Sequence, residues 1–466
     1  MRADRHIILS AAVLLMASCG KAPAPSPVYE PVPDDREILA MVPDDVPNTA
    51  WYKDLFLDGG ANLNPGVKID GAVANGEIPA AVLRLGYSCE YFLSTHDDPF
   101  AQAASTDVDL QRQIFCGSGP DHNGVLLYPD GEPRFRMIFV FGGQSTMHGK
   151  SLGEKGLSRV RDFYAGGGSY VGSCAGAYLS GQYASGSKSP YFNIWYGGNV
   201  ISTGLSSSST GVRIVEGSPL LQYYDFGADR YVEGVRHNGG GYMDTEGAPA
   251  GTEVLALFGT DPSGSTSKRF YGKPNIWAYK ASPCSGRLVV CGSHPEDGRD
   301  GEILDLTTSM FMYARQGSGC AKVKGVLHRG EKRYMDDILG YDPEYGAIGD
   351  LQCHHFVLYL PSAKSSLTIS ITGKEGFDLQ LFAKRGAFAF PENDPDAVAS
   401  ASSSSQTLTV SRPDAGLWYV TVRCATTVGS SLEVTDSRSG KGRHFVYSGN
   451  TDVLEGVPYT IVADWK

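Results

Sequence analysis

The sequence has no excess of basic residues. It contains 40 Lys and Arg against 51 Asp and Glu, which gives a formal net charge of −11 at pH 7. Proteins whose main activity is to bind nucleic acid or anionic lipid need concentrated Lys and Arg. The charge balance therefore argues against both classes, and we expect no nucleic-acid partner.

A membrane-spanning run is also missing from the N-terminus. The apolar stretch Ile7–Leu15 is too short to cross a bilayer as a permanent helix. Arg2 and Arg5 precede it and a segment of small residues ends at Cys19, which is the order of regions in a secretory signal. We therefore expect the protein to be exported.

Residues 16–19 resemble the lipobox of bacterial lipoproteins. The resemblance implies cleavage before Cys19 and lipidation of that cysteine, which would anchor the protein to a membrane of the bacterial cell envelope, at its periplasmic or surface face. The alternative is an ordinary secretory signal in which the cysteine stands by chance. With the anchor, the proline-rich segment 21–35 becomes a tether between membrane and folded protein.

No internal repeat is evident, and 466 residues exceed the length of one ordinary domain. We divide the chain into a signal peptide, a tether with an N-terminal extension, an α/β domain, a connector and a β-sandwich, at residues 1–19, 20–76, 77–318, 319–345 and 346–466. In the extension, an apolar cluster either docks on the α/β domain or belongs to a disordered segment. The cluster is Trp51, Tyr52, Leu55 and Phe56.

Cysteines are few enough to consider one by one. Of nine, Cys19 is assigned to lipid and Cys174 to chemistry, and the seven that remain cannot all pair. In an exported protein the possible disulfides are Cys89 with Cys116, and Cys284 with either Cys291 or Cys320. The sequence does not choose between them.

The clearest chemical signal is the segment Gly172–Ala177, which reads Gly-Ser-Cys-Ala-Gly-Ala. A cysteine between glycines, just after the apolar strand 169–171, is typical of a nucleophile elbow, a sharp turn from a strand into a helix. The N-terminus of the helix that begins at Ala175 would favour a thiolate at Cys174. The other interpretation is a small buried cysteine without chemistry.

A base and a carboxylate follow another apolar strand, 288–291. His294 stands two residues before Glu296, close enough for the carboxylate to hold the imidazole in one orientation. Alone, His294 would be an ordinary loop histidine. Together with Cys174 the two residues predict a Cys-His-Glu catalytic triad.

The apolar strand 136–141 ends in Gly142 and Gly143. Backbone N–H groups of glycines can approach a ligand closely, so Gly143 and Ala175 are predicted to form an oxyanion hole. A helical pattern over 151–164 comes next, and the order strand, helix, strand, elbow, helix predicts a parallel α/β crossover. The ligand crevice of such a sheet lies at the carboxyl ends of its strands.

These residues resemble a known family. Gly172–Tyr178 and His294–Glu296 are similar to motifs of the class I glutamine amidotransferase-like superfamily, and most similar to its biotin–protein ligase N-terminal type domain, over about residues 77–318. The resemblance implies a flavodoxin-like parallel sheet sandwiched by helices. It also implies that Cys174 is the nucleophile and that the histidine and the glutamate complete the triad.

Two motifs found in relatives of this superfamily are missing. Glutamine amidotransferases usually have His-Gln where this chain has Ala177-Tyr178, and no adenylate-forming Gly-Arg-Gly-Arg motif of a biotin ligase occurs. The elbow is also similar to the Ser-Ala-Gly-Ala elbow of dipeptidase E and cyanophycinase-like peptidases. We therefore expect a free-standing amidase or peptidase and no biotinylation.

His237–Tyr242, His-Asn-Gly-Gly-Gly-Tyr, resembles another segment of the same family. It makes His237 and Asn238 candidates for substrate binding, as Gly142 is after its strand. An equally good interpretation is a glycine-rich turn between two strands. We expect no metal and no cofactor.

From about residue 346, short apolar strands alternate with Gly, Pro and Ser turns, which predicts an all-β sandwich. Gly376–Leu381 and Ala415–Val422 resemble the bacterial pre-peptidase C-terminal domain, an accessory module common on secreted hydrolases.

The pattern as a whole predicts an exported hydrolase that cleaves an amide or peptide bond, in a small-molecule or peptide substrate, through an acyl-enzyme on Cys174. An alternative is a non-catalytic surface module whose inherited pocket binds a peptide or glycan. A third is a subunit that modifies or senses a partner through a thioester or disulfide.

Overall fold

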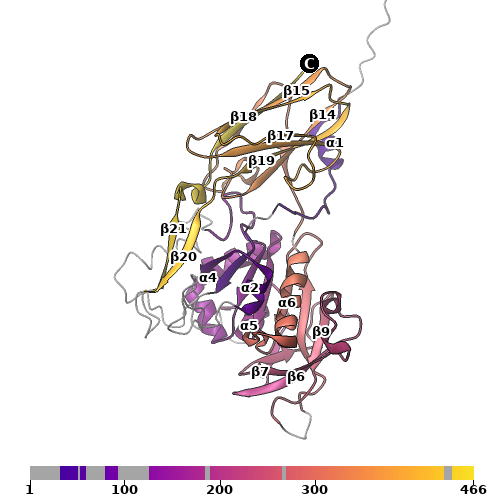
Figure 1. Cartoon of the computed structure of the whole chain (residues 1–466), viewed down its shortest axis with the longest axis vertical. Coiled ribbons are helices and arrows are strands. Elements are labelled where there is room, and N and C mark those ends of the chain that lie inside the picture. The colour runs from indigo at the N-terminus through magenta and orange to yellow at the C-terminus, as the bar shows by residue number, and fades with distance from the viewer. Residues whose placement is uncertain are drawn as a thin grey trace, which may run out of the picture.

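The computed structural model describes residues 32–50, 53–58, 79–92, 125–183, 189–264, 269–317, 319–434 and 443–466. They form one large sheet with helices, a pair of smaller sheets and two two-stranded sheets, and Figure 1 shows their arrangement. The expected signal peptide with Cys19, most of the tether, Trp51, Tyr52 and Cys116 lie outside the described residues. Within the described ranges, no helix combines the length and the apolar character that a membrane span requires.

The large sheet has nine strands in the order β2-β1-β3-β4-β11-β10-β9-β6-β7. Its first five strands are parallel: β2 Cys89–Phe92, β1 Leu55–Asp58, β3 Met137–Val140, β4 Ser169–Ser173 and β11 Arg287–Cys291. The other four are antiparallel to their neighbours: β10 Pro274–Lys280, β9 Glu253–Phe258, β6 Ser208–Ile214 and β7 Tyr231–His237.

The α/β class is thus correct, but the uniformly parallel sheet that we expected is not. Parallel neighbours need a crossover, usually a helix. In the described part of the chain, no α-helix separates consecutive strands from β6 to β11. Among themselves these strands therefore pair as antiparallel neighbours, whereas β11 pairs in parallel with β4 on its other side. The sheet is thus mixed.

The helices lie mainly against the parallel half of the large sheet, and α6 (Gly301–Gln316) also reaches β7. α6 packs on β4, β11, β7 and on α2 (Ala80–Leu85), whereas α4 (Ser145–Ala165) packs on α5 (Ala175–Ser180). In α6, Leu306, Met310 and Tyr313 are buried. Their spacing places them on one face of the helix.

The extension before residue 77 contributes a strand to the large sheet. β1 lies between β2 and β3, and its Leu55, Phe56 and Leu57 are fully buried. Four residues are too few to show a period, so the sequence indicated only an apolar cluster.

The sandwich consists of two sheets. One has the order β12-β14-β19-β16-β17 and the other β13-β22-β15-β18. Their bounds are β12 Val323–Val326, β14 Cys353–Leu360, β19 Gly416–Cys424, β16 Leu379–Arg385, β17 Ala397–Ala399, β13 Lys332–Met335, β22 Tyr459–Trp465, β15 Ser366–Gly373 and β18 Ser405–Ser411.

The segment 319–345, expected to be a connector, supplies β12 to one of these sheets and β13 to the other. Both strands lie at sheet edges and contain a lysine: Lys332 is exposed, whereas Lys324 is buried and pairs with Asp130. Edge strands can carry charges because one side faces solvent, which hides the apolar alternation of a strand.

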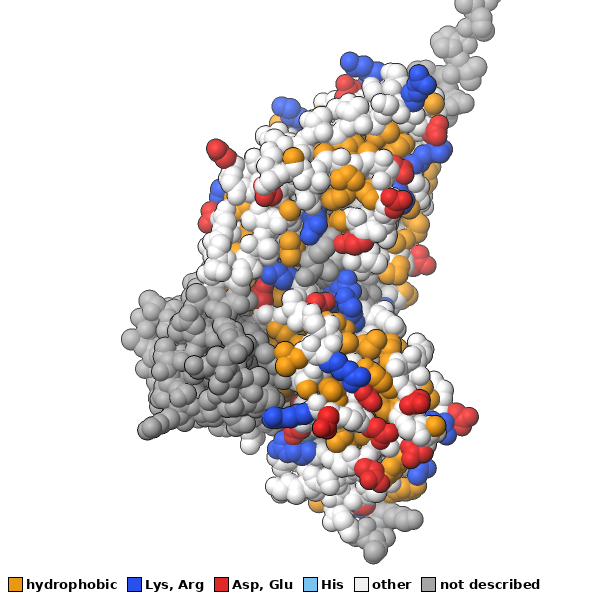
Figure 2. All heavy atoms as spheres, viewed as in Figure 1, with side chains coloured by type: hydrophobic (Ala, Val, Ile, Leu, Met, Phe, Trp, Pro, Cys, Tyr) orange, Lys and Arg blue, Asp and Glu red, His pale blue; other side chains and the backbone are white. Residues whose placement is uncertain are grey.

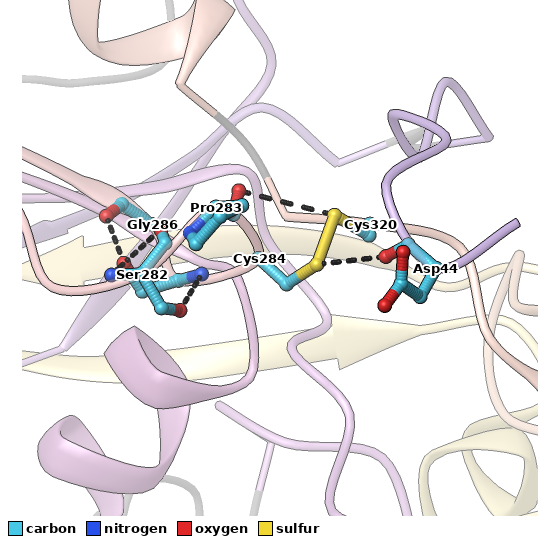
Figure 3. Close-up of a disulfide and its surroundings, with 7 residues drawn as sticks. Asp44, Ser282, Pro283, Cys284, Gly286 and Cys320 are labelled. Carbon is cyan, nitrogen blue, oxygen red and sulfur yellow. Dashed lines mark hydrogen bonds between the residues drawn. A yellow bond between two sulfur atoms is a disulfide. The ribbon is translucent and has the colours of Figure 1, made fainter.

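A disulfide and the N-terminal segment both contact the start of the segment 319–345 (Figure 3). Cys284 pairs with Cys320, the second of the two expected alternatives, whereas Cys291 is buried in β11. The carbonyl oxygen of Asp44 lies 3.0 Å from the Cys284 Sγ. Pro47 forms a β-bridge with Cys320, so the chain before β1 pairs directly with the start of the sandwich.

Buried charges connect the two parts of the molecule. The Arg134 guanidinium donates to both Glu90 oxygens, at 2.6 and 2.9 Å, and also to Asp350, which precedes β14. Lys53 Nζ lies 2.7 Å from Glu90 Oε1. We call these four residues the junction cluster. A hairpin of β20 (Gly429–Val434) and β21 (Arg443–Ser448) adds a bond from the Tyr447 hydroxyl to Glu90.

Candidate active site

The carboxyl ends of three parallel strands converge at one edge of the large sheet. Val140 of β3 pairs with Gly172 of β4, and Ser173 pairs with Cys291 of β11. The Cys174 N–H donates to the Cys291 carbonyl at 2.9 Å. The residues at the ends of these strands are therefore neighbours, as the crossover pattern predicted.

Cys174 stands in the sharp turn between β4 and α5. Its φ of 47° and ψ of −100° are outside the regions that non-glycine residues favour, which is typical of strained residues at functional sites. The turn requires Gly176, because a Cβ there would be 2.2 Å from the Val140 carbonyl oxygen. This local geometry matches the predicted elbow and directs Cys174 toward His294.

His294 and Glu296 form a buried pair after β11. His294 Nδ1 and Glu296 Oε1 are 2.9 Å apart, and both residues are less than 10% exposed. Glu296 belongs to a short 3₁₀ turn, Pro295–Asp297, which is held by a bond from the Thr307 hydroxyl to the Pro295 carbonyl. The spacing of two residues brings the carboxylate to the imidazole as expected.

Ser173 is a residue of this site that the sequence did not indicate. Its hydroxyl donates to Glu296 Oε1 at 2.7 Å, so this oxygen accepts from the serine as well as from the imidazole. Glu296 Oε2 is buried and has no hydrogen-bond partner among the described residues. The contact depends on the register of β4 against β11, and no local motif encodes it.

The electrostatics favour a charged imidazole at His294. Burial lowers its pKa, but the Glu296 charge and hydrogen bonds with Cys174 and Glu296 outweigh burial and raise the pKa to about 11. By contrast, burial raises the pKa of the Cys291 thiol well above its ordinary value. Of these two neighbouring thiols, Cys174 is the one that is hydrogen-bonded with the His294 imidazole.

Gly142 packs against the imidazole. A Cβ on it would lie 2.2 Å from His294 Cε1 and 3.2 Å from Cys174 Cβ, so any larger residue would displace the ring. Gly143 is exposed, with a φ of 140°, and Ala175 is the first residue of α5. The first N–H groups of a helix have no acceptor within the helix, so the Ala175 N–H makes no hydrogen bond within α5.

The two other candidates from the sequence lie at different depths. His237 is fully buried, with Nε2 2.7 Å from the Thr203 hydroxyl and Nδ1 3.0 Å from the Ser293 hydroxyl. Burial, and then the charge of His294, lowers its pKa to about 4. Both ring nitrogens of His237 are therefore occupied by hydroxyl groups of the protein.

Asn238 reaches the centre of the site with its backbone. Its carbonyl oxygen lies 3.3 Å from Cys174 Sγ and 3.4 Å from His294 Nε2. Its side-chain oxygen points elsewhere and accepts from the Ser207 N–H at 3.1 Å. The sequence indicated Asn238 as a candidate for substrate binding, and in the structure its carbonyl makes the contact with the thiol.

No group of three or more His, Cys, Asp or Glu side chains that could hold a metal ion is found in the described ranges. His354 and His355 contact different partners, Tyr459 and Thr421. Acidic and basic side chains are interspersed over the described face of the molecule (Figure 2).

No family model and no curated protein matches the chain. Solved structures are similar to parts of it. A candidate GMP synthase subunit from Thermoplasma acidophilum is 12% identical, with 57% of this chain and 94% of that chain covered and a TM-score of 0.32. A glutamine amidotransferase is 17% identical, over 50% and 90% of the two chains, with a TM-score of 0.31.

The pre-peptidase C-terminal domain of a Bacillus anthracis collagenase is 12% identical, over 30% of this chain and 90% of that domain, with a TM-score of 0.18. The structural neighbours thus include glutamine amidotransferase-like folds and a pre-peptidase C-terminal domain. At these low scores the similarities carry no argument about function, which has to be inferred from the residues of the site.

Proposed function

We propose that the protein is a cysteine-dependent hydrolase of amide or peptide bonds. The observation that carries the proposal is the buried His294–Glu296 pair directed at Cys174 in its strained turn. A thiol next to an imidazolium that a carboxylate stabilises is the arrangement needed for an activated sulfur nucleophile.

In the proposed reaction the Cys174 thiolate attacks the substrate carbonyl carbon. The N–H groups of Gly143 and Ala175 hold the developing oxyanion. The C–N bond then breaks as the His294 imidazolium gives its proton to the leaving amine. Water, deprotonated by His294, releases the acid from the thioester and restores the thiol.

We also propose the finer family and location. The motifs at Gly172–Tyr178 and His294–Glu296 support a class I glutamine amidotransferase-like domain of the biotin–protein ligase N-terminal type, with the flavodoxin-like layout limited to the parallel half of the sheet. The strand motifs near Phe377 and Trp418 support a pre-peptidase C-terminal-like sandwich. The signal-like N-terminus supports export and a lipid anchor at Cys19.

The test is a search for an acyl-enzyme. The mature protein is incubated with a library of peptides and simple amides, and intact-mass and peptide spectra locate any acyl group. We expect it on Cys174 and expect turnover to vanish in Cys174→Ala. Cys291→Ala is the matched control, because this buried thiol lies at the end of the neighbouring strand. Turnover that persists in Cys174→Ala overturns the proposal.

A second candidate is a binding module without turnover. The observation in its favour is that Cys174 is only 4% exposed and that the Asn238 carbonyl already contacts it. Ligands retained equally by wild type and Cys174→Ala, with no acyl adduct in either, would select this candidate.

A further inference from the structure

Two loops cover the thiol. The short strands β5 (Val200–Ser202) and β8 (Gly241–Met243) are antiparallel, and further along the same two segments Ser208 pairs with His237. Between these pairings the ladder is interrupted by residues 203–207 on one side and 238–240 on the other. We call these two stretches the cover loops.

One of the cover loops contacts the site directly. The Asn238 carbonyl oxygen accepts from Cys174 Sγ and lies next to His294 Nε2. A substrate carbonyl must lie against the same sulfur before attack. The loop therefore occupies the place that a substrate would need.

The cover loops are held mainly by each other. The Gly239 N–H donates to the Leu205 carbonyl, the Ser207 N–H to the Asn238 side chain and the Thr203 hydroxyl to the Gly240 carbonyl. Tyr178 adds a longer bond of 3.4 Å to the Gly239 carbonyl. Their outer residues, including Gly204, Ser206 and Gly239, are exposed to solvent. Lifting residues 204–207 and 238–239 together breaks the Tyr178 bond and the two contacts of the Asn238 carbonyl, whereas the Thr203 hydroxyl can stay on His237 Nε2.

The backbone of the loops is suited to such a movement. Gly204, Ser207 and Gly239 have positive φ values of 67°, 52° and 70°. A positive φ is energetically costly for a residue with a side chain. The two glycines therefore avoid this cost in the closed form of the loops. The Gly240 end is fixed, because a Cβ there would lie 1.7 Å from the Gly292 carbonyl oxygen.

We infer that the cover loops, through the Asn238 carbonyl, determine which ligands reach Cys174 and keep the thiol closed until they lift. The inference deepens the proposed function and rests on it, because opening of the site controls a reaction only if Cys174 acts on a substrate. The carbonyl of Asn238 belongs to a peptide group and lies against the thiol. A ligand must therefore bring a carbonyl group that replaces it, and the cover loops select for such ligands. Bulky reagents must wait for the loops to open.

The experiment measures labelling of Cys174 in the full mature chain by peptide mass spectrometry. Iodoacetamide is the small reagent and fluorescein maleimide the bulky one, both at pH 9, where an ordinary thiol is largely ionised and access limits the rate. In wild type we expect the bulky reagent to react more slowly at Cys174, relative to a small thiol standard.

Gly239→Ala is the informative variant. A Cβ at Gly239 meets no atom within 4 Å, so only backbone strain acts, and it disfavours the closed loop. We expect bulky labelling about tenfold faster than in wild type, the effect of one alanine in the left-handed region. Gly234→Ala is the matched control, because Gly234 lies in β7 with a φ of 72°, equally open space and no contact with the cover loops.

Equal bulky labelling in Gly239→Ala, Gly234→Ala and wild type would overturn the inference. Melting temperatures of the three proteins separate local opening from general loss of stability, since both variants carry the same strain. The labelling needs no substrate, so a chain without acyl-enzyme chemistry still tests the cover loops. A chain with turnover but unchanged labelling would retain the proposed function and lose this inference.

Discussion

Two buried polar clusters in this molecule have similar burial and different organisation. In the junction cluster, Arg134 and Lys53 face Glu90 and Asp350, so each charge has a partner of opposite sign. At the site, Glu296 serves both Ser173 and His294 with one oxygen, while its other oxygen has no partner among the described residues.

The backbone conformation also differs between the two clusters. None of the four junction cluster residues has a positive φ, whereas Cys174 is strained. Paired charges with relaxed backbone indicate a structural role, and strain beside a perturbed imidazole indicates chemistry. Burial and pairing alone would not separate the two clusters, because both contain buried atoms without a hydrogen-bond partner among the described residues: Arg134 Nε and Asp350 Oδ1 at the junction, Glu296 Oε2 at the site. The strained backbone and the perturbed imidazole do separate them.

The largest effect is expected from breaking the junction cluster. Arg134→Leu leaves Glu90 and Asp350 buried with Lys53 as the remaining cation, and losing one partner of a buried ion pair costs about 3–5 kcal/mol. Urea unfolding measures the free energy of unfolding. Arg84→Leu, which removes an exposed ion pair with Asp305, is the control and should cost about 1 kcal/mol or less. Similar losses in both variants would contradict the structural role.

At the site, Glu296→Gln should reduce reactivity. Without the carboxylate charge the pKa of His294 falls from about 11, so less thiolate forms in acid. We expect alkylation of Cys174 at pH 6 to slow on the order of tenfold or more. Asp297→Asn is the control, because that exposed carboxylate pairs with Arg236. Equal rates in the two variants would argue against the triad.

Much of this site could be predicted from the sequence, because its signals are local. The elbow and the spacing from His294 to Glu296 each lie within a few residues. Ser173 and the Asn238 carbonyl were missed because their contacts depend on strand register and on loop closure. β1, β12 and β13 were missed for another reason: each has four residues, and pairing partners far away in the chain define them as strands.

A smaller effect is expected at Ser173. Ser173→Ala removes one hydrogen bond from the buried Glu296 carboxylate, which disfavours its ionised form. The acid limb of the alkylation profile of Cys174 should move up by about one pH unit, and Ser173→Thr, which keeps the hydroxyl, should restore it. Ser180→Ala, another buried serine near the site, should leave the profile unchanged.

The smallest effect concerns pH and His237. Its pKa is about 4 in the folded protein, below the unfolded value near 6.5, so the unfolded chain binds more protons between these pH values. Its contribution to stability is present above about pH 6.5 and is lost as the pH falls toward 4. Unfolding free energies measured across this range should decline less steeply in His237→Asn. An unchanged slope would mean that His237 is not buried as a neutral imidazole.

The most direct test of an activated thiol is the pH dependence of Cys174 alkylation by iodoacetamide, in wild type and in His294→Ala. We predict that wild-type Cys174 reacts well below the pH at which a free thiol ionises, and that His294→Ala shifts the reaction to the ordinary thiol range. Ordinary thiol behaviour in both proteins would contradict an activated Cys174–His294 pair.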